Sequence, residues 1–141
     1  MASIIPREVK LAVATGYSGE TLKIALFNDA TLTTGFVDDG SEDTYTEIAA
    51  AHAEVTSTGY TAEGYTLANK TTGYDGSQDA YLDNSVNPTW TGVTFTATHA
   101  VLYENTTKLV RAIYDLGGSK AVTTGTFTLI LDAARLLTVT S

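Results

Sequence analysis

Threonine alternates with apolar side chains in the second half of the chain, most clearly along Thr89–Thr98 and Thr126–Leu131. A period of two places one face of a strand in a core and the other face in water. Threonine suits the wet face, because its β-branch favours extended backbone while its hydroxyl stays solvated. The pattern therefore predicts antiparallel β-structure in this half of the chain.

Turn residues divide this half into a series of short strands. The expected strands lie near Tyr65–Thr71, Asp79–Leu82, Thr89–Thr96, His99–Tyr103, Lys108–Leu116, Gly125–Leu131 and Leu136–Thr140. The expected turns are Gly73–Gly76, Asn87–Pro88, Glu104–Thr106, Gly117–Ser119 and Asp132–Ala134. Short strands at a spacing of roughly 8–12 residues are typical of a sandwich or barrel. We therefore expect a mainly β fold, an antiparallel β-sandwich or jelly-roll-like barrel, with one or two short N-terminal helices.

The first third of the chain supplies those helices. Pro6–Ala14 predicts a short helix, because proline fits the first turn and apolar residues recur on one face. The expected buried face is made of Ile5, Val9, Ala12 and Val13. Thr21–Phe27 alternates as a strand, and Thr44 with Glu47 matches a capping box that predicts a second helix over Tyr45–Glu54.

Length and charge limit the organisation and the partners. The 141 residues fit a single β-rich domain, residues 1–141, with residues 1–18 as an N-terminal arm and short helix. Lys and Arg number 8 against 16 Asp and Glu, a net charge of −8, so we expect no direct nucleic-acid partner. We also expect no membrane partner, because apolar runs stay well short of roughly 18 residues. We expect no secretory signal, because Met1–Glu8 lacks a basic start followed by a long apolar stretch and a small-residue cleavage site.

The reactive side chains offer little for catalysis. The chain has no Cys, which excludes thiolate chemistry, zinc-thiolate sites and disulfides. Its two histidines, His52 and His99, come without a Gly-x-Ser-x-Gly motif, and we interpret both as packed or rim residues. We therefore expect no enzyme, no catalytic residue, no cofactor and no metal site. A pair of carboxylates for glycoside hydrolysis is a spatial feature that sequence leaves open.

The acidic run Asp38–Asp43 has two interpretations. Clustered carboxylates supply the hard oxygen ligands that calcium prefers, although the spacing differs from that of an EF-hand loop. A solvated loop whose last acids precede a helix N-terminus explains the run equally well, and we favour that interpretation.

Several aromatic residues allow either a stacking platform for sugars or cross-strand packing. They are Tyr60, Tyr65, Tyr74, Tyr81 and Trp90. We favour packing, because cross-strand aromatic pairs commonly stabilise sheets. An apolar N-terminus without an obvious core partner is a second candidate contact. The candidate partner contacts are therefore Ile4, Ile5, Tyr74, Tyr81 and Trp90.

A series of motifs resembles small virion proteins of tailed bacteriophages. The motifs are Ile4–Lys10, Leu22–Asn28, Thr58–Asn69, Pro88–Thr91, His99–Tyr103, Tyr114–Gly118 and Gly125–Thr128. They cover most of the chain and are weakest over Val37–Glu54. Where family members have Asp-Phe-Gly, this chain has Asp115-Leu116-Gly117.

The resemblance implies a non-enzymatic structural component of the virion, assembled in the cytoplasm of the bacterial host. The best-fitting role is a capsid decoration (cement) protein, a homo-oligomer that binds the major capsid protein and stabilises the head shell. A neck, collar or tail accessory ring protein that binds other virion proteins is one alternative. A carbohydrate-binding module on the virion surface is another.

Overall fold

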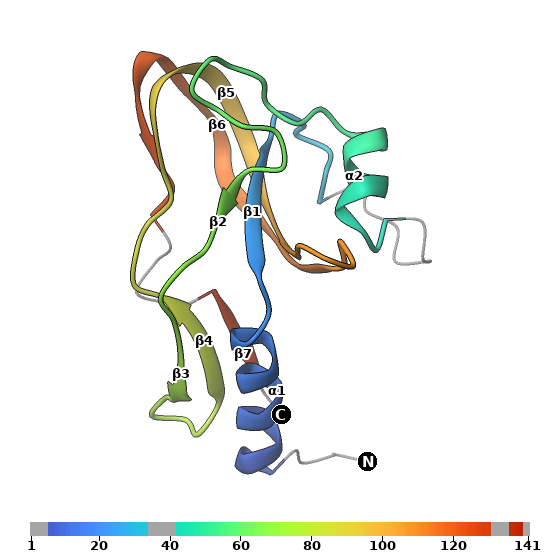
Figure 1. The fold of residues 1–141 in the computed structure, drawn as a ribbon, viewed down its shortest axis with the longest axis vertical. Helices are drawn as coiled ribbons and strands as arrows, with labels where there is room; N and C mark the ends of the chain where they lie inside the picture. Colours follow the sequence, from blue (N-terminus) through green and yellow to red (C-terminus); the bar gives the residue numbers. More distant parts are fainter. Residues whose placement is uncertain (1–5, 34–41, 131–135, 140–141) are drawn as a thin grey trace. The chain divides into compact units, whose positions relative to one another are not determined.

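The computed structural model describes residues 6–33, 42–130 and 136–139 (Figure 1). Its elements are α1 (Arg7–Ser18), β1 (Leu22–Phe27), α2 (Tyr45–Ala51), β2 (Tyr65–Thr66), β3 (Lys70–Tyr74), β4 (Ala80–Asn84), β5 (Thr89–Glu104), β6 (Val110–Thr128) and β7 (Leu137–Val139). Every strand pair among these is antiparallel, which confirms a mainly β fold with a short N-terminal helix. The finer prediction of a sandwich or barrel stays a prediction.

The chain divides into two compact units. The smaller unit comprises Met1–Thr21, Leu67–Pro88 and Leu129–Ser141, and the larger unit comprises Leu22–Thr66 and Thr89–Thr128. In the smaller unit α1 packs on a sheet of order β3-β4-β7, and the larger unit holds α2 and a sheet of order β2-β1-β5-β6. A single domain over residues 1–141 stays a prediction, because two compact units can belong to one folded domain.

Two predicted strand breaks are wrong. Thr89–Thr96 and His99–Tyr103 belong to the single strand β5, and β6 continues through the expected turn at Gly117–Ser119. Gly117 and Gly118 have φ of 71° and 97°, and they form a bulge in β6 rather than a reversal. Glycine with positive φ serves a bulge as well as a turn, so the sequence signal was ambiguous.

The predicted buried face of α1 is also wrong. The expected core positions Val9, Ala12 and Val13 are exposed, and Ile5 lies outside the described residues. Lys10 and Ala14 are buried instead. The Lys10 ammonium lies 2.7 Å from an Asp79 carboxylate oxygen, in the turn before β4. This ion pair compensates the burial of the lysine charge, and it joins positions too far apart in sequence for a pattern to reveal.

The larger unit packs α2 against the central strands of its sheet. Its core cluster contains Ala25, Phe27, Leu32, Tyr45, Ile48, Val101 and Tyr103. The rings of Tyr45 and Tyr103 stack at 4.5 Å between centroids, which fixes α2 on β5. The predicted capping box is present, since Thr44 and Glu47 each accept a backbone hydrogen bond from the other. The helix ends at Ala51, before the predicted Glu54, because His52 has extended backbone.

Candidate functional site

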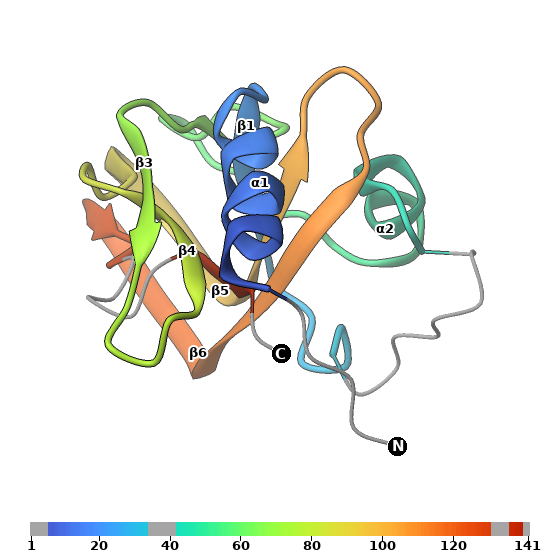
Figure 2. The ribbon, with the colours of Figure 1, turned by 90° about the horizontal axis from the view of Figure 1, so that it is seen from below.

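The outer edge of β6 is an edge of the sheet in the larger unit, and the described residues place no further strand beside it. The sheet order β2-β1-β5-β6 leaves β6 paired with β5 on one side only. In the views of Figures 1 and 2, β6 is the orange strand that follows β5. Unpaired N–H and C=O groups along a strand edge are ready to pair with another chain. The edge is therefore a candidate docking surface.

A short segment covers the first residues of this edge. The Asp43 backbone carbonyl accepts a hydrogen bond from the Val110 amide at 2.9 Å, and the Tyr45 amide donates to the Lys108 carbonyl at 2.8 Å. Thr44 forms an isolated bridge with Leu109. Beyond Val110, no strand within residues 6–33, 42–130 or 136–139 pairs with the outer edge.

The exposed part of β6 carries little charge. Its charged residues are Arg111, Asp115 and Lys120, and the stretch Ala121–Thr128 has none. Asp115 and Lys120 bracket the bulge, where the Asp115 carboxylate accepts from the Gly117 amide at 2.8 Å. The exposed residues of the stretch Ala121–Thr128 are Ala121, Thr123, Thr124, Thr126 and Thr128. This surface is neutral and rich in threonine.

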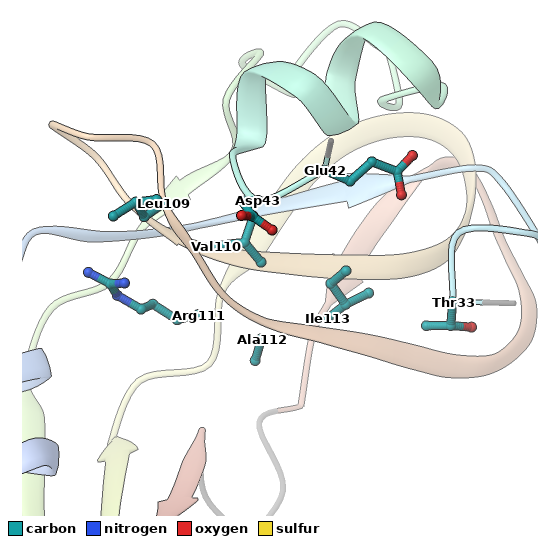
Figure 3. A pocket seen from close by; sticks show the side chains of 8 residues that line it. All are labelled: Thr33, Glu42, Asp43, Leu109, Val110, Arg111, Ala112 and Ile113. Carbon is teal, nitrogen blue, oxygen red and sulfur yellow. The ribbon is translucent and has the colours of Figure 1, made fainter. Parts of the chain in front are cut away.

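A pocket of about 500 Å³ adjoins the start of the edge (Figure 3). Its lining residues are Thr33, Glu42, Asp43, Leu109, Val110, Arg111, Ala112 and Ile113. Figure 3 shows the Glu42 and Asp43 side chains on the segment before α2, with the others, apart from Thr33, on β6 or just before it. Thr33 and Glu42 flank residues 34–41, which the structure does not describe. We therefore assign no ligand to this pocket.

His52 is held between two carboxylates near the pocket. Its Nδ1 lies 2.8 Å from Asp29 Oδ2, and its Nε2 lies 2.9 Å from Glu42 Oε1. Glu42 also lines the pocket. Because the acids lie on opposite sides of the ring, they do not converge on a shared metal position. Within the described residues there is no cluster of three His, Asp or Glu side chains suited to a metal ion.

A second buried polar network centres on Glu54. Its carboxylate accepts hydrogen bonds from the hydroxyls of Tyr45 at 2.5 Å and Tyr60 at 2.8 Å, and from the Glu63 amide at 2.9 Å. Burial, followed by the hydrogen bond to Glu54, raises the pKa of the Tyr45 hydroxyl. Burial is also the main cause of the raised pKa of Tyr60. Both tyrosines therefore stay protonated donors at neutral pH, and the network fixes the loop between α2 and β2.

The structure separates the candidate partner contacts. Trp90 is buried in the larger unit, with its ring centroid 5.8 Å from that of Tyr60 and 5.9 Å from that of Tyr65. Tyr74 and Tyr81 are half-buried in the smaller unit, on the paired strands β3 and β4. Ile4 and Ile5 lie outside the described residues. The aromatic packing we favoured is found for the residues around Trp90.

The structure shows which groups contact the second histidine, His99, which the sequence analysis interpreted as a packed or rim residue. His99 is buried in β5, and its ring contacts the hydroxyls of Thr98 and Thr33 at 3.0 Å.

Of the acidic run, only Glu42 and Asp43 fall within the described residues, so the calcium and solvated-loop interpretations of Asp38–Asp43 stay predictions. Sequence analysis missed the ring contacts of His52, because its partners lie 10 and 23 positions away without a repeating pattern.

Comparison with known proteins gives no relative. The chain matches no protein-family model, no curated protein and no solved structure. Within the described residues, neither helix has the length and apolar character needed to cross a membrane. The resemblance to phage virion proteins is therefore a hypothesis drawn from the sequence alone.

Proposed function

We propose that this chain is a non-enzymatic structural component of a tailed-phage virion, most specifically a capsid decoration protein. The observation that carries the proposal is the outer edge of β6 over Ala121–Thr128, beside which the described residues place no further strand. The motifs that resemble phage virion proteins supply the biological context. The proposed partners are the major capsid protein and further copies of this chain.

The composition of β6 supports docking rather than protection of the edge. Natural proteins usually protect edge strands by keeping them short, by bulging them, or by placing proline and several charges along them. Of these features, β6 has bulges in its pairing with β5. β6 is 19 residues long and contains no proline. A chain with a net charge of −8 repels its own copies. The uncharged stretch Ala121–Thr128 offers a surface where that repulsion is weakest.

Binding to an assembled shell explains how such a protein would act. A partner that binds the assembled shell and not its free subunits stabilises the assembly by mass action. A closed cyclic oligomer multiplies modest contacts through valency. The chain would therefore stabilise the head against internal DNA pressure without any catalytic step.

Charge placed on the docking edge is expected to prevent incorporation into particles. Tagged wild-type protein, supplied during phage growth, should copurify with virions. The Ala121→Lys/Thr126→Lys variant changes two exposed residues of β6. Its incorporation should fall at least about tenfold, which corresponds to about 1.4 kcal/mol of binding free energy. Quantitative immunoblotting of purified particles measures the effect.

A matched control is available in the same unit. Thr56→Lys/Ala62→Lys makes the same two replacements at exposed positions of the loop between α2 and β2. It should incorporate like the wild type, and both variants should show wild-type urea unfolding. Equal incorporation of the β6 variant would contradict docking through this edge. Absence of the wild type from particles would contradict the virion function itself.

A further inference from the structure

The contacts of His52 require a charged imidazole. Both ring nitrogens face carboxylate oxygens, at 2.8 Å and 2.9 Å, and the His52 side chain is only 8% exposed. A carboxylate ion can only accept, and an imidazole donates from both nitrogens only when it is protonated. The geometry therefore corresponds to an imidazolium between Asp29 and Glu42.

The surrounding charges favour that protonated form. Burial lowers the pKa of His52, but its hydrogen bonds with Asp29 and Glu42 outweigh burial and the net shift is upward. Within the described residues, these two carboxylates are the charged groups that form ion pairs with the ring. Within the described residues, neither forms an ion pair with a lysine or arginine. The imidazolium is therefore their shared countercharge.

The two carboxylates differ in how firmly they are held. Asp29 Oδ1 accepts from the Thr31 hydroxyl at 2.7 Å and the Thr31 amide at 2.9 Å, so Asp29 keeps partners without His52. Glu42 Oε2 is buried without a hydrogen-bond partner within the described residues. A neutral imidazole donates from one nitrogen only. Loss of the ring proton therefore removes one of the two hydrogen bonds and the positive charge that both carboxylates face. Asp29 keeps its bonds to Thr31, whereas Glu42 has no other hydrogen-bond partner within the described residues to compensate for the lost charge.

We propose that Asp29, His52 and Glu42 form a pH-responsive latch that holds the Glu42–Tyr45 segment over the start of the β6 edge. Through this segment, the latch supports the hydrogen bond of Val110 with Asp43. Deprotonation of His52 weakens the contact that holds Glu42 and loosens the adjacent hydrogen bond between Val110 and Asp43, whereas Tyr45 stays held by Tyr103 and Glu54. The backbone amide of Val110, at the start of β6, then becomes accessible for pairing. This inference stands independently of the proposed function.

The pH range of the latch follows from the two groups in it whose pKa values are shifted, His52 and Asp29. His52 has a raised pKa, so its stabilising contribution is complete below about pH 6.5 and is lost as the pH rises through the pKa of the folded protein. Hydrogen bonds, first from the Thr31 hydroxyl and then from His52, lower the pKa of Asp29 to about 2. Its contribution is present above about pH 4 and is lost as the pH falls toward 2. The latch is therefore closed in mildly acidic solution and opens in alkaline solution.

NMR titration of the full chain tests the latch directly. We expect His52 to titrate above about pH 6.5, with His99 resolved as the second histidine signal. The protection of the Val110 amide against hydrogen exchange should fall through the same titration, after correction for hydroxide catalysis. The factor by which protection falls should match the measured rise of the His52 pKa above its ordinary value. Ala25, in the centre of the β1–β5 pair, should keep its protection.

Two neighbouring carboxylates provide a matched pair of variants. Glu42→Gln removes the charge that faces His52 Nε2, so the pKa of His52 and the pH dependence at Val110 should both decrease. Asp43→Asn removes the next charge along the chain, which forms no ion pair with the ring, and should leave both unchanged. A wild-type His52 that titrates at or below about pH 6.5 would overturn the proposal. Constant protection of Val110 through the titration would also overturn it.

Discussion

Replacing Gly64 by alanine is expected to destabilise the larger unit by more than about 4 kcal/mol. Gly64 has φ of +77°, and a Cβ atom there would lie 2.0 Å from the Ile24 carbonyl oxygen and 2.6 Å from the Ala25 Cα. Both neighbours belong to β1, whose centre is fully buried. The clash involves backbone rather than a mobile side chain, so either the loop or the central strand must move. Urea unfolding followed by tryptophan fluorescence measures the loss.

Gly92→Ala separates this clash from simple backbone strain. Gly92 also has positive φ, at +66°, but a Cβ atom there meets nothing within 4 Å. Its replacement should cost only about 1–2 kcal/mol, the usual cost of left-handed backbone for a residue with a side chain. Equal destabilisation by the two variants would show that close approach to β1 is not the reason for glycine at Gly64.

Truncation of Trp90 to alanine is expected to cost about 3–5 kcal/mol of unfolding free energy. The side chain is 6% exposed, and its ring contacts Tyr60, Tyr65 and Phe127 at centroid distances of 5.8, 5.9 and 6.1 Å. Its removal leaves a cavity that the surrounding rings fill only in part. Urea or thermal unfolding, monitored by circular dichroism, gives the difference.

Two further variants make the Trp90 result specific. Trp90→Phe keeps an aromatic ring in the cluster and should cost clearly less than alanine. Thr91→Ala changes the exposed neighbour and should stay within about 0.5 kcal/mol of the wild type. A loss below about 1 kcal/mol for Trp90→Ala would contradict a role in core packing.

The packing of Trp90 also bears on the carbohydrate-binding alternative. A loss of glycan binding in Trp90→Ala would report unfolding as readily as a lost sugar contact. Tyr74 and Tyr81 are only half-buried, so their replacement offers a cleaner test of that hypothesis.

Local sequence patterns predicted which segments form helices and strands better than they predicted the buried faces of these elements and the breaks between strands. Alternating threonine identified β5 and β6, and the capping box identified the start of α2, because both signals are confined to a few neighbouring residues. The breaks at Thr96–His99 and Gly117–Ser119 were wrong, since bulges use the same small and positive-φ residues as turns. Sequence alone does not distinguish a bent long strand from two short ones.

The candidate site depended on contacts between distant positions. The open edge follows from the order of strands in the sheet, which periodicity does not encode. Burial of Lys10 depends on Asp79, and the His52 latch joins three separate segments. Sequence analysis identified His52 as a packed or rim residue, but it did not reveal the two carboxylates that hold its ring.

The copy number of this chain in purified virions tests the central claim most directly. Mass spectrometry with labelled standards, alongside particle imaging, gives its ratio to the major capsid protein. A decoration protein that tiles the shell should be present at about one copy per capsid subunit or about one per three. A ratio below about one in thirty, as for a neck or tail ring, would contradict the decoration function. Complete absence from particles would contradict the virion function.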